Sequence, residues 1–277
     1  MRYDQAVILT DLDGTLFRTD GKISPEDIVA VSSFIAEGGY FGLGTGREPH
    51  NALLHLPGVP LNGPSIVLNG AAVYDFATGR YLDCVPIDME AAADVEQHIQ
   101  ALNMPLDQQI YTTDGIFYAS PLEDADPGFL RIHQPTSFLP LEKLKEKTWI
   151  KIVLLEREAN ALLPVHAYMK EKGYDKRLAV IEGTTDVVKI GKYQELLPEG
   201  VNKGTAVPLL KQLAQYAGRT VFAVGDYWND YEMLQAADIG CAPENAIDEV
   251  KAVSRFVLPS HNDSPIAYLI REVIPKL

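Results

Sequence analysis

Apolar runs alternate with amphipathic segments along the first part of the chain. The run at 6–10 predicts a buried strand. Residues 24–39 predict a helix, because an N-cap serine, a proline and acidic residues precede its apolar positions and glycines follow them. A second strand is expected over 40–47, ending in a glycine-rich turn, and two more extended runs flank the turn at Asn69-Gly70. Strand, helix and strand in this order predict a parallel sheet.

The pattern changes after Cys84. Helices are expected at 89–102 and 157–173, and Pro164 predicts a kink or break in the second of them. The expected strands of this region are 115–119, 149–156, 178–183 and 186–190. This mixture predicts a separate α+β module inserted into the first one, with bounds 84–190.

From about Gly191 the first pattern returns, and residues 191–277 are expected to complete the module begun by 1–83. Strands are predicted at 220–226, 238–242 and, as an edge strand, 255–258; helices are predicted at 202–218, 229–237, 245–253 and 265–274. The fold class is therefore α/β, with a parallel-sheet core and an inserted α+β module.

Composition and charge restrict the partners. The chain has 277 residues, 47% of them hydrophobic and 22% charged, with a net charge of −14. This balance argues against nucleic acid or an anionic membrane as the main partner, but a small anionic substrate stays compatible with a locally positive site. Cys84 and Cys241 lie far apart in sequence and suggest neither a disulfide framework nor a zinc site. With no apolar run near the roughly 18 residues of a membrane span, we expect a cytoplasmic protein.

Polar side chains with possible chemical roles follow several of the predicted strands or begin predicted helices. Ligands of open parallel sheets lie at the carboxyl ends of the strands, so Asp11, Thr45 and Asp226 should face one crevice. The full set is Asp11 with Asp13, Thr45-Gly46-Arg47, Lys203, and Asp226 with Asn229-Asp230.

These residue types suit phosphoryl transfer. Clustered carboxylates would attract a hard cation such as Mg²⁺, which prefers oxygen ligands. Thr45 offers a hydroxyl, Gly46 permits close backbone approach, and Lys203 adds a positive charge at a helix start, where backbone N–H groups also favour anions. A carboxylate can itself attack phosphorus and form an aspartyl-phosphate.

Each feature also has an ordinary structural interpretation. Asp-x-Asp-Gly is common in turns, lone lysines are usually solvated, and Asp226 could cap a helix. Residues 11–22 are no EF-hand loop, since glycine is fourth and lysine twelfth, and residues 42–47 miss the G-x-G-x-x-G spacing. The six histidines show no metal-ligand spacing and are interpreted as structural. Only the joint pattern makes the structural interpretations improbable.

The joint pattern resembles the haloacid dehalogenase (HAD) superfamily. Its four motifs are matched in order by "DLDGTL" at 11–16, "GTGR" at 44–47, "NKG" at 202–204 and "GDYWND" at 225–230. The stretch "VLNGA" at 67–71 and the insert between the second and third motifs resemble the Cof-type subfamily. The resemblance implies a Rossmann-like core with a large α+β cap that closes over it and sets substrate specificity.

The resemblance also implies roles for these residues. Asp11 would be the nucleophile, and Asp13 the general acid for the leaving oxygen and then the base that activates water. Thr45 and Lys203 would hold the phosphate, with Lys203 also balancing the charge of Asp11, and Asn229 would contact phosphate or metal waters. Asp13 at its position favours phosphatases and phosphomutases over ATPases of the superfamily.

Magnesium ligands are implied in the same way. They would be the side chains of Asp11 and Asp226 and the backbone carbonyl of Asp13, with Asp230 supporting that shell. The chain departs from the subfamily near Ser264-Pro265, where a glycine is usual, so a role for Asn262 or Asp263 does not carry over. The bulky pair Tyr227-Trp228 could narrow the entrance, touch the cap or pack in the core.

The sequence therefore predicts a Mg²⁺-dependent phosphatase for a small phosphorylated metabolite, with sugar phosphates as the leading class and Arg47 as a residue that could read the substrate. A phosphomutase of the same superfamily is the first alternative, and a non-catalytic phosphate-binding regulatory protein is the second. Neither nucleic acid nor a membrane is expected as a partner, and the expected assembly is a monomer or a small homo-oligomer.

Overall fold

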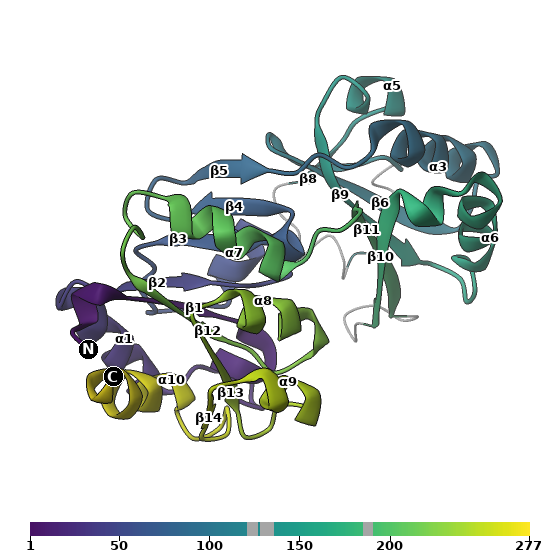
Figure 1. Ribbon diagram of the computed structural model, residues 1–277. Helices are drawn as coiled ribbons and strands as arrows, with labels where there is room; N and C mark the ends of the chain where they lie inside the picture. Colours follow the sequence, from purple (N-terminus) through teal and green to yellow (C-terminus); the bar gives the residue numbers. More distant parts are fainter. Residues whose placement is uncertain (121–126, 128–135, 185–190) are drawn as a thin grey trace. The chain divides into compact units, whose positions relative to one another are not determined.

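The computed structural model describes residues 1–120, 127, 136–184 and 191–277 (Figure 1). The chain divides into two compact units, Met1–Asp83 with Asn202–Leu277 and Cys84–Val201. The second predicted boundary, at residue 191, differs from this division because Lys192–Pro198 is hydrogen-bonded into the sheet of the second unit. The strand expected at 186–190 lies outside the described residues.

A five-stranded parallel sheet forms the centre of the first unit and confirms the predicted α/β core. Its order is β14-β13-β12-β1-β2, with parallel pairing throughout. The strand bounds are Ala6–Thr10 (β1), Tyr40–Leu43 (β2), Thr220–Val224 (β12), Ile239–Pro243 (β13) and Phe256–Leu258 (β14). The predicted edge strand is thus β14, at one end of the sheet.

Helices cover both faces of this sheet. Successive side chains of a strand point to opposite sides, so each buried strand presents apolar side chains to helices on both faces. In β1, Ile8 joins the hydrophobic cluster that contains Phe34 of α1 and Ile266 of α10, whereas Leu9 joins the cluster that contains Val207 of α7. The helix bounds are Pro25–Ala36 (α1), Pro49–Leu54 (α2), Lys203–Gln212 (α7), Tyr231–Ala236 (α8), Asp248–Val253 (α9) and Pro265–Tyr268 (α10).

A small three-stranded sheet, β3-β4-β5, continues the first unit. The strands are Pro64–Val67 (β3), Ala72–Asp75 (β4) and Arg80–Cys84 (β5), and a parallel bridge between Gly44 and Ile66 joins β3 to the end of β2. The sequence did not predict β5, because its side chains are mostly exposed and lack an apolar alternation.

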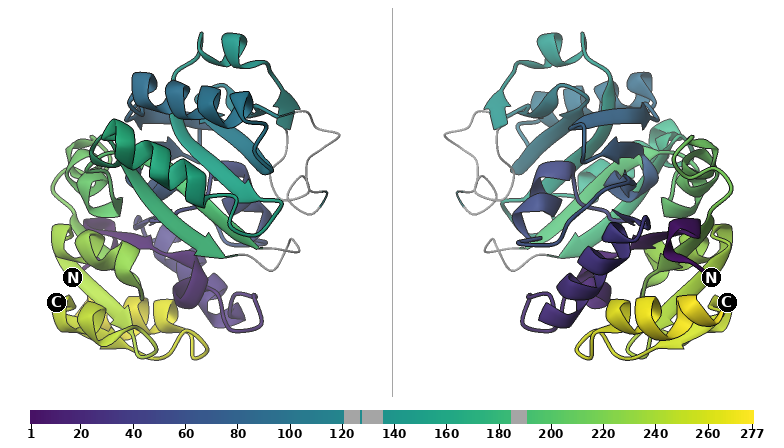
Figure 2. Two further views of the ribbon diagram at one scale, coloured as in Figure 1. Left: turned by 90° about the vertical axis from the view of Figure 1, so that its right-hand side faces the viewer. Right: turned by 90° about the vertical axis from the view of Figure 1, so that its left-hand side faces the viewer.

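The second unit is an α+β module with a six-stranded sheet in the order β10-β11-β9-β6-β7-β8. Helices α3 (Met89–Ala101) and α6 (Leu163–Lys172) lie side by side and pack in one hydrophobic cluster with β6, β9 and β11 (Figure 1, Figure 2). A short helix α5 spans Leu141–Leu144. The strands are Leu106–Thr112 (β6), Gly115–Tyr118 (β7), Thr136–Phe138 (β8), Trp149–Glu156 (β9), Leu178–Thr184 (β10) and Lys192–Pro198 (β11).

Two sequence expectations for this unit were wrong. Strands β6, β8 and β11 were missed. β6 and β11 each bury polar side chains, such as Gln109 and Gln194, that break the apolar pattern. The helix expected over 157–173 begins only at Leu163, so Pro164 lies in its first turn, where the missing N–H costs no hydrogen bond, and not at a kink. Among the described residues, no helix is both long and apolar enough to cross a membrane.

Glu96 is a buried carboxyl group in the second unit, outside the predicted site. It lies on α3, and within the described part of the chain neither of its side-chain oxygens has a hydrogen-bond partner. Burial raises the pKa of Glu96 to about 8. The folded state therefore holds this side chain in its neutral, protonated form at neutral pH.

The ionisation of Glu96 predicts a stability that falls as pH rises. Between pH 4.5, the ordinary pKa of the group, and about 8, the folded protein binds a proton that the unfolded chain has lost. We expect the free energy of unfolding to fall by roughly 2–4 kcal/mol more over this window in the wild type than in Glu96→Gln. Denaturant unfolding at pH 5 and pH 8 measures the difference. Glu90→Gln, an exposed position on the same helix, is the control. An equal pH dependence of stability in both variants would contradict the raised pKa of Glu96.

Candidate active site

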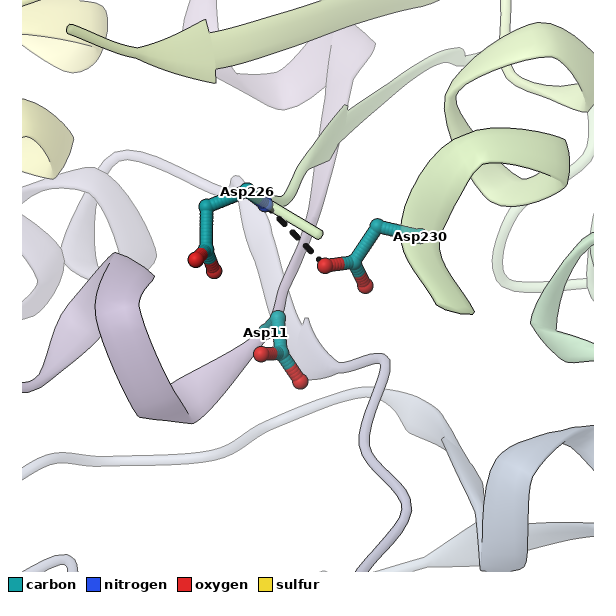
Figure 3. Close-up of side chains that lie close together, drawn as sticks. All are labelled: Asp11, Asp226 and Asp230. Atoms are coloured by element: carbon teal, nitrogen blue, oxygen red, sulfur yellow. Dashed lines mark hydrogen bonds between the residues drawn. The ribbon is translucent and has the colours of Figure 1, made fainter. Parts of the chain in front are cut away.

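The carboxyl ends of β1 and β12 bring Asp11 and Asp226 together. The two strands pair in parallel with Thr10 opposite Val224, so the chain leaves both at the same level of the sheet. The Asp11 backbone N–H donates to the Val224 carbonyl at 2.8 Å, which extends the hydrogen-bond ladder between β1 and β12 by one residue. The buried Asp11 therefore lies at the carboxyl edge of the sheet. Figure 3 shows the carboxylates of Asp11, Asp226 and Asp230 gathered around this point. Asp11 and Asp226 therefore lie together, as expected from the strand ends, whereas the expected place of Thr45 in the same crevice stays a prediction.

Lys203 joins two of these carboxylates. It follows Asn202, whose side chain caps α7 by accepting from the Thr205 N–H at 3.0 Å. Its ammonium donates to Asp11 Oδ1 at 2.7 Å and to Asp230 Oδ1 at 2.6 Å, and its side chain is 0% exposed. Lys203 is therefore a buried bridge between distant segments and not the solvated surface lysine of the alternative interpretation.

Asp230 also orders the loop that carries Asp226. Its Oδ2 accepts from the backbone N–H of Asp226 at 3.0 Å (Figure 3) and of Tyr227 at 3.2 Å. Both oxygens of Asp230 therefore have donors, one from Lys203 and one from the loop. Asp230 is therefore better placed to support the site than to act as a metal ligand with a free oxygen.

Thr15 and Gly14 bring the turn after β1 against Asp226. The Thr15 hydroxyl donates to Asp226 Oδ1 at 2.8 Å and so ties the turn to this carboxylate. Gly14 has φ +77°, and a Cβ there would lie 2.4 Å from Asp226 Oδ2. The turn thus requires glycine for conformation and for space.

The loop after β2 faces two asparagines. The Thr45 side chain is buried, and its hydroxyl accepts from the Arg47 N–H at 3.1 Å. A Cβ on Gly46 would lie 2.7 Å from the Asn69 Oδ1, and Asn229 Nδ2 is 3.5 Å from that oxygen. Asn69 was missed as a site residue. The signal for it was the Asn-Gly turn, where Asn69 adopts φ 55°.

Asp13 and Arg47 form a pair beside the three carboxylates. The Asp13 side chain is 67% exposed, and its Oδ1 lies 2.8 Å from Arg47 Nη2. Asp13 is absent from the group of side chains that could share one ion, which comprises Asp11, Asp226 and Asp230. The carbonyl ligation suggested for Asp13 therefore stays a prediction.

The aromatic pair in the last motif is exposed. Tyr227 is 57% and Trp228 52% exposed, so neither packs in the core. Asn262, whose role the sequence left in doubt, accepts from the Thr19 N–H at 3.0 Å and so orders a loop.

A family model described as haloacid dehalogenase-like hydrolase matches residues 8–270. The chain belongs to this family. The predicted resemblance is thereby confirmed, and the protein is an enzyme of a family whose named members include phosphatases.

Two named phosphatases match this hydrolase over nearly their whole length. A 5-amino-6-(5-phospho-D-ribitylamino)uracil phosphatase of Bacillus subtilis is 25% identical over 96% of this chain and 97% of its own. A pyridoxal phosphate phosphatase of Escherichia coli is 26% identical over 95% and 97%. The crystal structure of TM0651 from Thermotoga maritima has a TM-score of 0.76 and 24% identity, covering 95% of this chain and 96% of that one, and shares the fold.

The three carboxyl groups of this hydrolase's site have raised pKa values. Burial raises the pKa of Asp11 to about 7 against the opposing charge of Lys203, and burial raises that of Asp226 to about 6. Burial also raises the pKa of Asp230. Burial alone would lower the pKa of Lys203, but the charges and hydrogen bonds of Asp11 and Asp230 together raise it, so the ammonium stays charged.

The donor set of this hydrolase fits a hard divalent cation. One carboxylate oxygen each from Asp11, Asp226 and Asp230 lies within 4.8 Å of the others. All donors are oxygens, as Mg²⁺ prefers, and the raised carboxyl pKa values mark a place where added positive charge would be stabilising. Since Asp230 is engaged by Lys203 and the loop, Asp11 and Asp226 are the better candidates for ligands.

Gly14→Ala should disrupt this hydrolase without removing any reactive group. The added methyl group would clash with the Asp226 carboxylate and force an alanine into a left-handed conformation. We expect a loss of roughly 1–3 kcal/mol in unfolding free energy and a weaker dependence of stability on added Mg²⁺. Thermal unfolding with and without Mg²⁺ measures both. The control is Gly21→Ala, which has similar φ but no atom near the new Cβ, so only the conformational cost should remain.

Proposed function

We propose that this hydrolase is a Mg²⁺-dependent phosphatase that cleaves a small phosphorylated metabolite, with sugar phosphates as the leading substrate class. The observation that carries the proposal is the buried Lys203 ammonium between Asp11 and Asp230, beside Asp226. A cation fixed in this way holds a carboxylate ready for attack and offers charge to a phosphoryl group, which suits a reaction governed by positioning and charge neutralisation.

The reaction would take place in two steps. Asp11 attacks phosphorus, the bond from phosphorus to the ester oxygen breaks, and Asp13 gives that oxygen a proton. Asp13 then removes a proton from water, which attacks the phosphorus of the aspartyl-phosphate and releases inorganic phosphate and free Asp11. Thr45, Gly46, Lys203 and Asn229 would hold the phosphoryl oxygens.

Mg²⁺ would be held by the side chains of Asp11 and Asp226 and by the Asp13 backbone carbonyl. When bound, it supplies charge that neutralises the transferring phosphoryl group. Asp230 would support the ion indirectly, because its two oxygens fix Lys203 and the backbone of the Asp226 loop. Thr15 would keep Asp226 oriented through its 2.8 Å hydrogen bond.

A phosphate-release screen tests this function. It should cover sugar phosphates and include pyridoxal phosphate and the ribitylaminouracil phosphate, for which relatives are named. The exposed rings of Tyr227 and Trp228 next to Asp226 give a specific reason to include such ring-bearing esters. Release should require Mg²⁺ and stop with a chelator. An isomeric phosphate ester in place of free phosphate would indicate a phosphomutase, and phosphate binding without turnover would indicate a non-catalytic protein.

A further inference from the structure

The Arg47 guanidinium donates hydrogen bonds to Asp13 and to helix α2. Its Nε donates to Asp13 Oδ2 at 3.1 Å, and its Nη2 lies 2.8 Å from Oδ1 and 2.9 Å from Oδ2. Its Nη1 donates to Asn51 Oδ1 at 2.9 Å and is 3.2 Å from His55 Nδ1. A guanidinium has five N–H groups, and these contacts engage at least three of them, one on each nitrogen.

The guanidinium is itself held in place. Asn51 is buried on α2, and His55 Nδ1 is 2.8 Å from the Asn51 carbonyl. The Glu48 carboxylate caps the start of α2 by accepting from the His50 and Asn51 N–H groups, and the Phe17 ring lies 5.6 Å from the Arg47 guanidinium. These contacts fix the orientation of the planar guanidinium, so its Nε and Nη2 groups point in one direction, toward the Asp13 carboxylate.

We propose that Arg47 is a positioning residue that acts through Asp13 and does not itself bind the phosphate. The inference rests on the proposed function, in which Asp13 serves as general acid and base. It replaces the sequence-based prediction that Arg47 reads the substrate, because Nε and Nη2 face the Asp13 carboxylate and Nη1 donates to Asn51.

The need for such a residue follows from the exposure of Asp13. A side chain that is 67% exposed samples several rotamers unless a partner selects one, and a misplaced proton donor costs rate even when the substrate is bound normally. The Arg47 fork engages both carboxylate oxygens, so it fixes the plane of the carboxylate as well as its position. Arg47 would therefore affect kcat far more than phosphate binding.

A double-mutant cycle with Asp13→Asn tests the inference, using p-nitrophenyl phosphate as substrate and inorganic phosphate as a competitive probe of binding. We expect Arg47→Ala to lower kcat by about 10- to 100-fold and to change KM and phosphate inhibition by less than about 3-fold. In the Asp13→Asn background the same substitution should have no further effect. Arg47→Lys should recover only part of kcat, and added guanidinium should partly rescue Arg47→Ala.

The dependence of the rate on the leaving group distinguishes a positioning role from a merely structural one, because loss of structure would lower activity on all substrates alike. Phenyl phosphate needs a proton on its leaving oxygen more than p-nitrophenyl phosphate does, so Arg47→Ala should lose more activity with phenyl phosphate. Arg18→Ala, which removes an exposed arginine paired with Asp20, is the matched control and should leave both substrates unaffected.

The outcomes separate this inference from the proposed function. A loss in phosphate binding that persists in the Asp13→Asn background would show that Arg47 binds phosphate directly and would overturn the inference alone. Full activity of Asp13→Asn by itself would overturn the acid–base role of Asp13 and, with it, the inference for Arg47. Absence of phosphate release by the wild type on every ester tested would overturn the proposed function.

Discussion

Asp11→Asn is expected to reduce phosphate release by at least about 10³-fold, because an amide cannot attack phosphorus as a carboxylate does. The substitution keeps the shape of the side chain and an oxygen that can accept from Lys203, which lies 2.7 Å from Oδ1. The loss should therefore appear in the chemical step. Burst or single-turnover measurements should show no phosphorylated enzyme.

The same substitution should leave the fold intact or strengthen it. Burial raises the pKa of Asp11 to about 7, so holding its charged form inside the protein lowers stability near neutral pH. A neutral amide avoids this cost, and the thermal midpoint of Asp11→Asn should be equal to or above that of the wild type. Asp20→Asn, at an exposed aspartate near the same loop, is the control for activity. Undiminished phosphate release by Asp11→Asn would rule out Asp11 as the nucleophile.

Lys203→Met should cost about 3–5 kcal/mol of unfolding free energy and nearly all activity. Methionine fills a similar volume, but Asp11 and Asp230 then remain buried without the ammonium that now lies 2.7 Å and 2.6 Å from them. Removing one partner of a buried pair is costly because the other charge stays desolvated. Denaturant unfolding gives the change in stability, and the phosphate-release assay gives the change in activity.

A lysine on the same helix provides the matched control for Lys203. Lys211 pairs with Asp238 at the surface of α7, where its side chain is 36% exposed. Solvent screens such a pair, so Lys211→Met should cost no more than about 1 kcal/mol and leave activity unchanged. Equal losses in the two variants would mean that the bridge to Asp11 and Asp230 does not stabilise the site. Adding Asp230→Asn to Lys203→Met should recover part of the stability but none of the activity.

Much of the fold followed from periodicity. Strand β1 is fully buried and β12 is buried apart from Thr220, and both consist mainly of apolar residues. Helix α1 has an N-cap serine and a proline in its first turn, so these elements could be predicted. Strands β5, β6, β8 and β11 were missed, and β5 failed for the opposite reason to β6 and β11. β5 is mostly exposed, whereas β6 and β11 bury polar side chains that only their tertiary environment stabilises.

The sequence by itself determined which chemical groups stand at the strand ends, because a parallel sheet carries the residues that follow its strands to one edge. Asp11 and Asp226 were placed in this way. Only the tertiary structure decided their partners: Lys203 reaches Asp11 across 192 positions of sequence, and Thr15 turns to Asp226. It also decided that the Arg47 donors face Asp13. The physical reason is that local pattern fixes which face of an element is buried, whereas a side-chain rotamer is selected by the hydrogen bonds and charges that distant segments bring to it.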